Sequence, residues 1–319
     1  MSDSAAAIKT ISFPDQDLLE AVQPLPDGLR GTVWDFRGDP VDVDAADIDA
    51  VVLPYLNAQD VLGALARATN LKLVQAQTTG VDGVAEAVGD DVAIASAAGV
   101  HAASTAELAV GLALASLRGI DAAARDQRDA RWRHERRLSL ADRKVLLVGV
   151  GGIGAEISKR LLPFEVELTR VGSKAREDEH GHVHGSDELV ELAREAEILI
   201  VITPLTEATR GLIDARVLAA LPDGALVVNV ARGAVVDSDA LTREVVSGRI
   251  NCAIDVFDPE PIPEGHPLWQ ADNALITPHV GGDTSAFQPR IVRLLKRQLA
   301  ALGSGSEPEN LVQRGRAWS

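Results

Sequence analysis

Lys144-Val-Leu-Leu-Val-Gly149-Val-Gly151-Gly-Ile-Gly154, followed by Ala-Glu-Ile-Ser-Lys-Arg-Leu-Leu, decides the fold of this chain. An apolar strand, a GxGxxG turn and the start of a helix follow one another without a break, which is typical of a site for a dinucleotide pyrophosphate. Gly149 permits the tight turn, Gly151 lets the backbone approach the phosphates, and Gly154 lets the helix pack close to its strand. The helix N-terminus offers N–H groups and a positive dipole end to the anion. We therefore predict cofactor contacts at Gly149, Gly151, Gly152, Ile153 and Gly154.

This stretch lies in the middle of the chain, and 143 residues precede it, enough for a domain of their own. A chain of 319 residues exceeds what one hydrophobic core usually organises, so two domains are expected. The content of hydrophobic residues, 46%, is enough to fill both cores. Alternating strand and helix patterns predict the α/β class.

Charge and cysteine content restrict the partners and the compartment. The net charge of −16 argues against nucleic acid or an anionic membrane as a partner, because both are negatively charged themselves. The single cysteine, Cys252, lies in a segment typical of a buried strand and fits a reducing cytoplasm. Residues 1–7 show no signal-peptide pattern, and no run of about 18 apolar residues occurs. We expect a cytoplasmic protein with no membrane partner.

Short apolar segments before the glycine-rich turn alternate with helical patterns, which predicts a small α/β domain. Strands are expected at residues 8–13, 31–36, 50–53, 71–75 and 92–95, and an amphipathic helix at 59–68. Ser104 to Arg118 predicts a long apolar helix with Ser104 as the N-cap and Glu107 at the capping-box position. A helix this apolar lies either in the centre of a core or in a subunit interface.

Apolar runs without alternation follow the turn, as expected for parallel strands covered on both faces. Strands are predicted at residues 166–171, 198–202, 225–230, 251–256 and 274–276, and helices at 187–196, 215–220 and 238–247. The final helix, at 286–302, would make the first domain discontinuous if it crossed back to it.

The end of the second strand of the nucleotide domain predicts which dinucleotide binds. In this fold a carboxylate there usually binds the adenosine ribose, whereas an arginine accommodates a 2′-phosphate. Gly172 stands at the expected position of the acid, among Arg170, Lys174 and Arg176, and Ser173 is able to donate to a phosphate oxygen. We therefore predict NADP(H) in preference to NAD(H).

The segment from Ala175 to Gly185 is predicted to be an exposed loop. Its acids Glu177, Asp178 and Glu179 would partly neutralise the nearby cations if those only solvate the loop. Its histidines, His180, His182 and His184, are close enough in sequence for a metal, but a site needs convergent geometry and a supporting shell. We therefore predict a solvated loop and no metal site.

Three polar side chains follow the ends of later strands, where open α/β sheets place their ligands. Arg232 would hold a substrate carboxylate and polarise the neighbouring carbonyl, and His279 would give a proton to its oxygen. Glu260 would stabilise the imidazolium and raise its pKa. Each also has an ordinary interpretation, as a surface arginine, a turn glutamate or a strand-end histidine. Their joint occurrence after a dinucleotide fold favours catalysis of carbonyl reduction.

The chain resembles the D-isomer-specific 2-hydroxyacid dehydrogenase family over most of its length. Five motifs occur in the order of that family: Val148-Gly-Val-Gly-Gly-Ile-Gly154, Thr203-Pro-Leu-Thr-Glu-Ala-Thr-Arg-Gly-Leu-Ile213, Asn229-Val-Ala-Arg-Gly233, Asp255-Val-Phe-Asp-Pro-Glu-Pro261 and Thr277-Pro-His-Val-Gly281. The resemblance implies two Rossmann-like domains with doubly wound parallel sheets, the nucleotide domain inserted into a discontinuous substrate domain. Residues 1–98 and 286–319 would form the substrate-binding domain, and residues 99–285 the dinucleotide-binding domain.

The same resemblance implies roles for individual residues. His279 would be the acid/base residue, Glu260 its partner and Arg232 the substrate anchor. On the cofactor, Asp255 would contact the nicotinamide end, Thr203 and Pro204 would line the adenosine side, and Gly281 would also make contact. On the substrate, Thr79, Gly80 and Val81 would present N–H groups to the carboxylate, and Tyr55 and Leu56 would lie near the side-chain pocket. The two domains would close over the substrate, and a homodimer would form through the nucleotide domain, with Ser104 to Leu117 as an interface candidate.

The sequence also departs from the family, and these departures narrow the substrate. No arginine or lysine accompanies Tyr55, Leu56 and Asn57, so a phosphorylated substrate such as phosphoglycerate is disfavoured. A small or apolar 2-keto acid, glyoxylate and hydroxypyruvate included, is predicted. No long regulatory extension follows Leu302. One alternative is a dinucleotide-sensing binding protein, like the transcriptional co-repressors of the family. Another Rossmann enzyme, such as a methyltransferase, requires Glu260 and His279 to lie outside the cleft.

Overall fold

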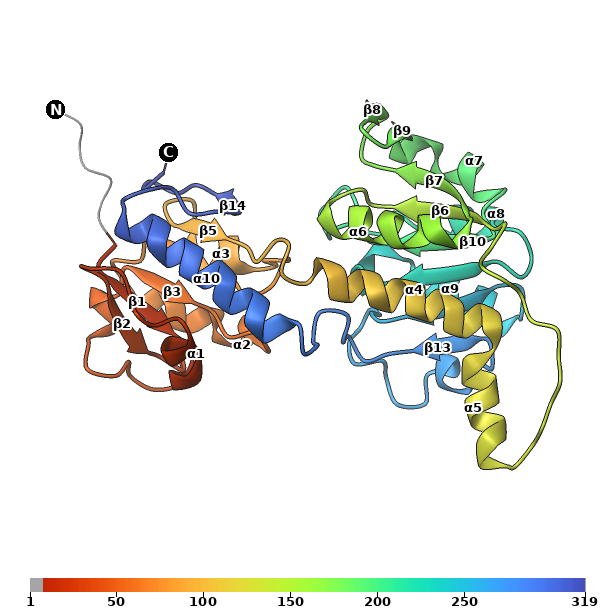
Figure 1. Cartoon of the computed structure of the whole chain (residues 1–319), viewed down its shortest axis with the longest axis horizontal. Helices are drawn as coiled ribbons and strands as arrows, with labels where there is room; N and C mark the ends of the chain where they lie inside the picture. Colours follow the sequence, from red (N-terminus) through yellow and green to blue (C-terminus); the bar gives the residue numbers. More distant parts are fainter. Residues whose placement is uncertain (1–7, 319) are drawn as a thin grey trace. The chain divides into compact units, whose positions relative to one another are not determined.

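The computed structural model describes residues 8–318 and divides into two compact units (Figure 1). Unit 1 comprises Met1–His101 and Ser285–Ser319, and unit 2 comprises Ala102–Thr284. The boundaries expected from sequence follow residues 98 and 285. Residues 1–7, where the sequence shows no signal-peptide pattern, lie outside the described part of the chain.

Unit 1 contains a six-stranded sheet in the order β14-β5-β4-β3-β1-β2. The strands are β1 (Thr10–Phe13), β2 (Arg30–Val33), β3 (Ala50–Val52), β4 (Leu73–Gln75), β5 (Ala93–Ala95) and β14 (Leu311–Gln313). All pair in parallel except β14, which joins β5 antiparallel. The chain order reverses between β1 and β3, and an α/β sheet binds ligands at the carboxyl ends of its strands near such a reversal.

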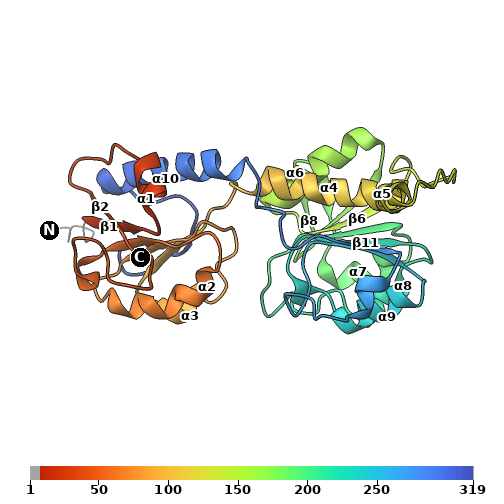
Figure 2. The ribbon, with the colours of Figure 1, turned by 90° about the horizontal axis from the view of Figure 1, so that it is seen from below.

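Helices cover both faces of this sheet (Figure 2). One face carries α1 (Gln16–Ala21) and α10 (Phe287–Gly303), and the other carries α2 (Ala58–Val61) and α3 (Val84–Val88). The apolar stripe of α10 is buried, and Gln298 Nε2 donates to Gln75 Oε1 of β4 at 2.7 Å. The C-terminal helix therefore belongs to the core of unit 1, so this unit is discontinuous in sequence.

Unit 2 contains a second six-stranded sheet, entirely parallel, in the order β13-β12-β11-β10-β6-β7. Its strands are β6 (Lys144–Val148), β7 (Glu167–Val171), β10 (Ile198–Val201), β11 (Leu226–Asn229), β12 (Asn251–Ile254) and β13 (Ala274–Ile276). Figure 2 shows α4 (Ala102–Arg118), α5 (Ile120–Arg128) and α6 (Gly152–Leu161) on one face, and α7 (Leu189–Ala193), α8 (Ala215–Ala220) and α9 (Ser238–Val246) on the other. The predicted α/β class with doubly wound parallel sheets is confirmed.

Most of the apolar residues of these strands are buried, as expected for strands covered on both faces. Cys252 on β12 is fully buried, as predicted, and burial raises the pKa of its thiol to about 12. No single helix in residues 8–318 is long and apolar enough to cross a membrane. Helices α4 and α5 are long and apolar enough only when they are taken together, and the two are bent by 64° relative to each other.

Three sequence-based expectations about helices are corrected. The helix expected at 59–68 is a short α2 followed by a 3₁₀ segment, η2 (Leu62–Arg67). The helix expected at 187–196 begins as the 3₁₀ turn η4 (Ser186–Glu188) and continues as α7. Ser104 is not an N-cap, because α4 begins at Ala102 and the Ser104 hydroxyl contacts Thr284 Oγ1 at 2.9 Å. Amphipathic periodicity does not distinguish one regular helix from two short ones.

The exposed loop expected between Ala175 and Gly185 is also corrected. It forms a hairpin of β8 (Arg176–Asp178) and β9 (Gly181–Val183), with Asp178 opposite Gly181. Gly181 has φ 98°, which suits a tight turn. The polar sequence of this segment gave no strand pattern. The hydrogen bonds that hold the hairpin come from Arg170, which lies outside the segment.

Candidate active site

The glycine-rich turn joins β6 to α6, beside the point where the strand order of unit 2 reverses. Gly149 has φ 113°, and a Cβ there would lie 2.5 Å from the Ile202 carbonyl oxygen. A Cβ at Gly154 would lie 2.0 Å from the Gly149 carbonyl oxygen. Because neither position accepts a side chain, the turn is tight and the N-terminus of α6 lies against it. This geometry suits an anion at Gly151 and Gly152, where a Cβ would meet nothing within 4 Å.

Gly172, directly after β7, lies beneath the guanidinium group of Arg176. A Cβ at Gly172 would approach Arg176 Nη1 at 2.8 Å, Val183 Cγ1 at 3.0 Å and Val150 Cγ2 at 3.2 Å. Arg176 also donates to the Lys174 carbonyl oxygen at 3.3 Å. The Arg176 guanidinium therefore lies where the side chain of a ribose-binding acid at position 172 would begin. Ser173, Lys174 and Arg176 are all exposed at this end of the sheet.

Arg170 makes different contacts from those predicted. Its guanidinium is buried and donates to both carboxylate oxygens of Asp178, at 2.8 and 2.9 Å. It donates also to the Gly181 and His182 carbonyl oxygens. The Arg170 hydrogen bond lowers the pKa of Asp178 to about 2, and the His180 N–H contributes. Arg170 therefore fastens the β8–β9 hairpin to the sheet.

Thr203 and Pro204 follow β10, the strand next to β6, after the intervening Ile202. Thr203 is partly exposed and Pro204 is exposed, at the same sheet edge as the glycine-rich turn. The Pro204 carbonyl oxygen accepts from Thr209 Oγ1 at 2.6 Å, which closes the loop that follows. The loop thus has a fixed start beside the predicted pyrophosphate site.

The Arg232 loop packs directly against the segment after β12. A Cβ at Gly233 would lie 2.0 Å from the carbonyl carbon and oxygen of Phe257, so only glycine fits. Asn229 folds the turn, because its Oδ1 accepts from the Ala231 N–H and its Nδ2 donates to the Arg232 carbonyl oxygen. Arg232 Nη1 donates to the Ala231 carbonyl oxygen at 2.8 Å. The close packing brings Arg232 near the segment that carries Glu260.

Asp255, buried at the end of β12, positions the loop of His279. Its carboxylate accepts from Thr277 Oγ1 at 2.6 Å, from the Val280 N–H at 2.9 Å and from the Gly281 N–H at 2.8 Å. Its carbonyl oxygen accepts from the His279 N–H at 2.8 Å. These bonds hold His279 in the left-handed conformation, with φ 52°. Such a conformation is rare for a residue with a side chain and is common at functional sites.

His279 and Glu260 form a hydrogen-bonded pair, with His279 Nδ1 2.7 Å from Glu260 Oε2. A carboxylate only accepts, so Nδ1 carries a proton and Nε2 is left for chemistry. Glu260 Oε1 accepts from the Phe257 N–H at 3.0 Å, which fixes the carboxylate. The hydrogen bond to Glu260 raises the pKa of His279, against the opposing effects of burial and the Arg232 charge. Burial raises the pKa of Glu260, but the bonds from His279 and Phe257 outweigh it and the pKa is lowered.

The substrate residues predicted in unit 1 follow β3 and β4, at neighbouring carboxyl ends. Tyr55 is partly buried and stacks on Phe287 with ring centroids 4.0 Å apart, and Leu56 is exposed. In the loop of Thr79, Gly80 and Val81, the Gly80 carbonyl oxygen accepts from Thr78 Oγ1 at 2.6 Å. Both loops are thus anchored at one edge of the sheet of unit 1.

Sequence reasoning missed four supporting residues. His101 stacks on Tyr55 and Phe287, and its Nε2 donates to the Gln77 carbonyl oxygen at 2.8 Å. Thr277 and Asn229 hold the catalytic loops through side-chain hydrogen bonds. Asn229 and Thr277 did stand in the quoted motifs, which was an available signal. His101 and Phe287 gave none, because they meet Tyr55 only in the folded unit.

A parallel nucleotide-binding sheet with a glycine-rich turn, and a histidine–glutamate pair beside an arginine, define a dinucleotide-dependent dehydrogenase. Comparison with known proteins agrees. The family model described as D-isomer specific 2-hydroxyacid dehydrogenase, NAD binding domain, matches residues 110–281. The chain belongs to the D-isomer-specific 2-hydroxyacid dehydrogenase family, and it is an oxidoreductase that uses a nicotinamide dinucleotide.

Individual relatives cover most of the chain. A hydroxypyruvate reductase from Thermotoga maritima is 34% identical over 73% of this chain and 78% of its own length. The human glyoxylate reductase/hydroxypyruvate reductase is 32% identical over 76% of this chain and 77% of its own. A crystal structure of a family member from Xanthobacter autotrophicus, in complex with NADPH and MES, has a TM-score of 0.81 and 29% identity, covering 98% of this chain and all of that one. An NADPH-dependent glyoxylate/hydroxypyruvate reductase from Sinorhizobium meliloti, solved with NADP and malonate, has a TM-score of 0.79 and 27% identity, covering 97% and 98%.

Proposed function

We propose that this enzyme reduces small unphosphorylated 2-keto acids, such as glyoxylate or hydroxypyruvate, and prefers NADP(H) to NAD(H). The observation that carries the cofactor preference is the guanidinium of Arg176 above Gly172, where a Cβ would lie 2.8 Å from Nη1. A cation in this place favours a 2′-phosphate, and a ribose-binding acid at Gly172 would displace the Arg176 guanidinium. The reductases named for glyoxylate and hydroxypyruvate among the relatives support the substrate class.

In this proposal Ser173, Lys174 and Arg176 bind the 2′-phosphate, whereas Arg170 is left out because its described bonds go to the hairpin. The remaining cofactor contacts follow the predicted set. They are Gly149, Gly151, Gly152, Ile153 and Gly154 at the pyrophosphate, Thr203 and Pro204 at the adenosine side, and Asp255 and Gly281 toward the nicotinamide end. Asp255 would combine that contact with its bonds to the His279 loop.

The proposed chemistry rests on three side chains of unit 2. When bound, the nicotinamide supplies a hydride to the keto carbon. Arg232 binds the substrate carboxylate and polarises the carbonyl. His279 gives its Nε2 proton to the keto oxygen, and Glu260 stabilises the imidazolium before that transfer. In the direction of oxidation the neutral His279 takes the hydroxyl proton at the same atom.

For the substrate, we propose that the N–H groups of Thr79, Gly80 and Val81 bind the carboxylate and that Tyr55 and Leu56 contact the side chain. Residues 1–98 with 286–319 would then form the substrate-binding domain and 99–285 the dinucleotide-binding domain. The aromatic stack behind Tyr55 makes its surroundings apolar. An apolar wall suits a short unphosphorylated chain better than a phosphate.

We propose a homodimer formed through α4. An open, mainly apolar groove beside Gly111 is lined by the side chains of Val110, Leu114, Pro163 and Phe164, with the charged side chains of Glu107, Lys159 and Arg160 also in its lining. Phe164 is 38% exposed and Leu162 next to it is 60% exposed. Apolar surface gathered in this way marks a contact with another chain, and a second copy would cover it symmetrically.

The cofactor preference is tested with Arg176→Ala. We expect wild-type kcat/KM to be higher with NADPH than with NADH, and the variant to lose roughly 10- to 100-fold with NADPH, since a charge-assisted hydrogen bond is lost. The value with NADH should stay unchanged. Arg194→Ala, an exposed arginine of the same unit paired with Glu191, is the control and should match wild type. A wild-type preference for NADH, or equal losses with both cofactors, would refute the proposal.

The substrate class is tested with a panel of glyoxylate, hydroxypyruvate, pyruvate and phosphohydroxypyruvate. Turnover should be highest with the small unphosphorylated acids. Faster turnover of phosphohydroxypyruvate would overturn this part. Tight binding of the dinucleotide without turnover of any acid would favour the dinucleotide-sensing alternative.

A further inference from the structure

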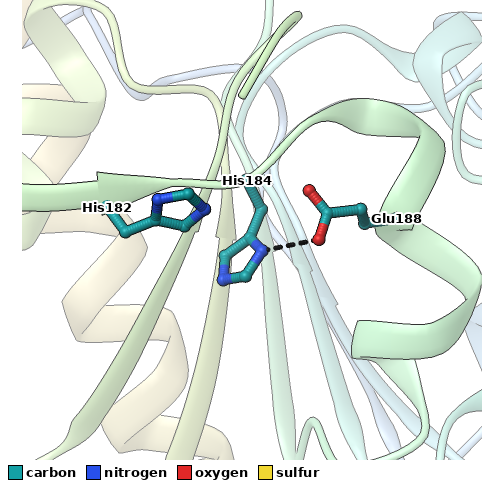
Figure 3. A group of neighbouring side chains, drawn as sticks. All are labelled: His182, His184 and Glu188. Atoms are coloured by element: carbon teal, nitrogen blue, oxygen red, sulfur yellow. Dashed lines mark hydrogen bonds and ion pairs between the residues drawn. The ribbon is translucent and has the colours of Figure 1, made fainter. Parts of the chain in front are cut away.

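Three side chains of the β8–β9 region, here called the hairpin cluster, converge on one another: His182, His184 and Glu188 (Figure 3). None of them is among the residues proposed to bind the cofactor or the substrate. One nitrogen or oxygen of each lies within 4.8 Å of those of the other two. The two imidazole rings meet edge to face, with centroids 4.5 Å apart. His182 comes from β9, His184 follows it, and Glu188 comes from η4. Within the described residues 8–318, this is the one group of metal-binding side chains that converges so closely.

Carboxylates orient both histidines. His182 Nδ1 lies 2.7 Å from Glu177 Oε1, and His184 Nδ1 lies 2.8 Å from Glu188 Oε2. Because a carboxylate only accepts, both Nδ1 atoms donate, and the lone pair of His182 is on Nε2. A histidine that ligates a metal commonly donates its second N–H to a carboxylate in this way. Glu177 therefore fixes the tautomer of His182 that a metal requires.

The third side chain, Glu188, is positioned by hydrogen bonds to both of its carboxylate oxygens. Glu188 Oε1 accepts from the Gly185 N–H at 2.9 Å. Glu188 Oε2 accepts from His184 Nδ1 at 2.8 Å. A charged carboxylate next to two imidazoles is a suitable donor set for a transition metal.

The backbone beneath the hairpin cluster is fixed on both sides. The His184 N–H donates to the Arg170 carbonyl oxygen at 2.8 Å, and the His184 carbonyl oxygen accepts from the Gly172 N–H at 2.9 Å. The pair of Arg170 and Asp178 holds the two strands of the hairpin to the end of β7. A donor set on a fixed backbone loses less conformational entropy when an ion binds.

We infer that His182, His184 and Glu188 bind one divalent transition-metal ion of the zinc type, with water completing its coordination. The ligands would be His182 Nε2, His184 Nδ1 and a Glu188 oxygen. The ion takes the place of the proton between His184 and Glu188, and that proton moves to His184 Nε2. Ligand atoms around a tetrahedral zinc are separated by about 3.4 Å. The donor atoms of these partly exposed side chains lie within 4.8 Å of one another, so the side chains need to close by up to about 1.4 Å. Two nitrogen donors of three exclude a preference for Ca²⁺ or Mg²⁺, which take oxygen ligands.

The test uses the intact, tag-free chain after treatment with a chelator. Titration with Co²⁺, followed by its visible absorption, and with Zn²⁺ in competition with a chromophoric chelator, should each give one equivalent of saturable binding. His182→Ala and Glu188→Gln should each weaken binding by at least about tenfold, because each removes a ligand.

His180→Ala is the matched control, because His180 is an exposed imidazole on the turn of the same hairpin and is outside the hairpin cluster. It should bind the metal as wild type does. Zinc should raise the melting temperature of wild type and of His180→Ala equally and that of His182→Ala by less, since a ligand stabilises the state that binds it in proportion to how tightly it binds. Absence of saturable binding, or equal affinity in wild type and His182→Ala, would overturn the inference.

Discussion

At the scale of the residue, the chemistry depends on how His279 is held. Its backbone has φ 52°, and its main-chain N–H is bonded to Asp255. Its ring is fixed separately by Glu260, which in turn is held by the Phe257 N–H. Two independent restraints leave Nε2 as the atom presented for proton transfer. A substitution at Glu260 therefore changes both the orientation and the protonation of the imidazole.

Glu260→Gln should move the pH dependence of reduction. Reduction needs protonated His279, and Glu260 raises the pKa of that histidine. Removing the negative charge lowers the pKa, so the loss of kcat/KM on the alkaline side should begin at a lower pH than in wild type. His279→Gln, which has no transferable proton, should lose roughly 10²- to 10⁴-fold in kcat. The measurement is the pH profile of kcat/KM with saturating reduced cofactor, and an unchanged alkaline limb in Glu260→Gln would contradict this role.

Sequence reasoning predicted Arg232, Glu260 and His279 together, because each follows an apolar strand and parallel strands end at one edge. It did not predict what holds them. The three bonds to the Asp255 carboxylate and the close contact at Gly233 join segments that are separate in the sequence. The contacts of Arg170 were also not predictable from the sequence. Its charge suggested a phosphate ligand, but a carboxylate eight residues later pairs with it.

At the scale of the element, the β8–β9 hairpin depends on the ion pair between Arg170 and Asp178. Arg170 is buried against the sheet, and Asp178 lies on the hairpin. The same guanidinium also bonds two carbonyl oxygens of the turn and β9. One side chain thus fixes the register of a two-stranded ribbon that is too short to be stable alone.

Asp178→Asn should lower the melting temperature at neutral pH. The folded pKa of Asp178 is about 2, below the ordinary 3.8, so its contribution to stability is present above the ordinary value and is lost as the pH falls toward 2. The difference between wild type and variant should therefore be largest at about pH 7 and shrink below about pH 4. Thermal unfolding followed by circular dichroism measures it. Glu179→Gln, at the turn of the same hairpin, should behave as wild type, and an equal decrease in both variants would remove the special role of Asp178.

At the scale of the whole molecule, the chain returns to its first sheet after completing the second. Apolar residues on α10, among them Ile291, Leu295 and Leu299, are buried in unit 1. The buried pair of Gln75 and Gln298 joins this helix to β4, and β14 then extends the same sheet. An amphipathic pattern predicts the helix but does not say which sheet it covers.

Gly111→Glu should dissociate the proposed homodimer. Gly111 lies in the apolar groove, and a Cβ there would meet no atom within 4 Å, so the substitution is tolerated within the subunit. In a dimer the added side chain and its charge would lie inside the contact, where the partner leaves no space for them and where removing the charge from water costs free energy. Light scattering coupled to size exclusion should give a dimer for wild type and a monomer for the variant. Gly63→Glu, also at an open position, but in unit 1, is the control. A wild-type monomer, or an unchanged dimer in Gly111→Glu, would contradict this interface.

The sequence by itself determined the α/β class, the strand order along the chain, the glycine-rich turn and the polar residues at the strand ends. These follow from local periodicity and from glycine spacing, which need no knowledge of distant contacts. Tertiary structure alone decided that residues 175–185 form a hairpin, that Arg170 pairs with Asp178, and that Arg176 lies over Gly172. It also brought His182, His184 and Glu188 together. The reason is physical: a charged or polar side chain pairs with whichever group the fold places beside it, and the sequence does not record that distance.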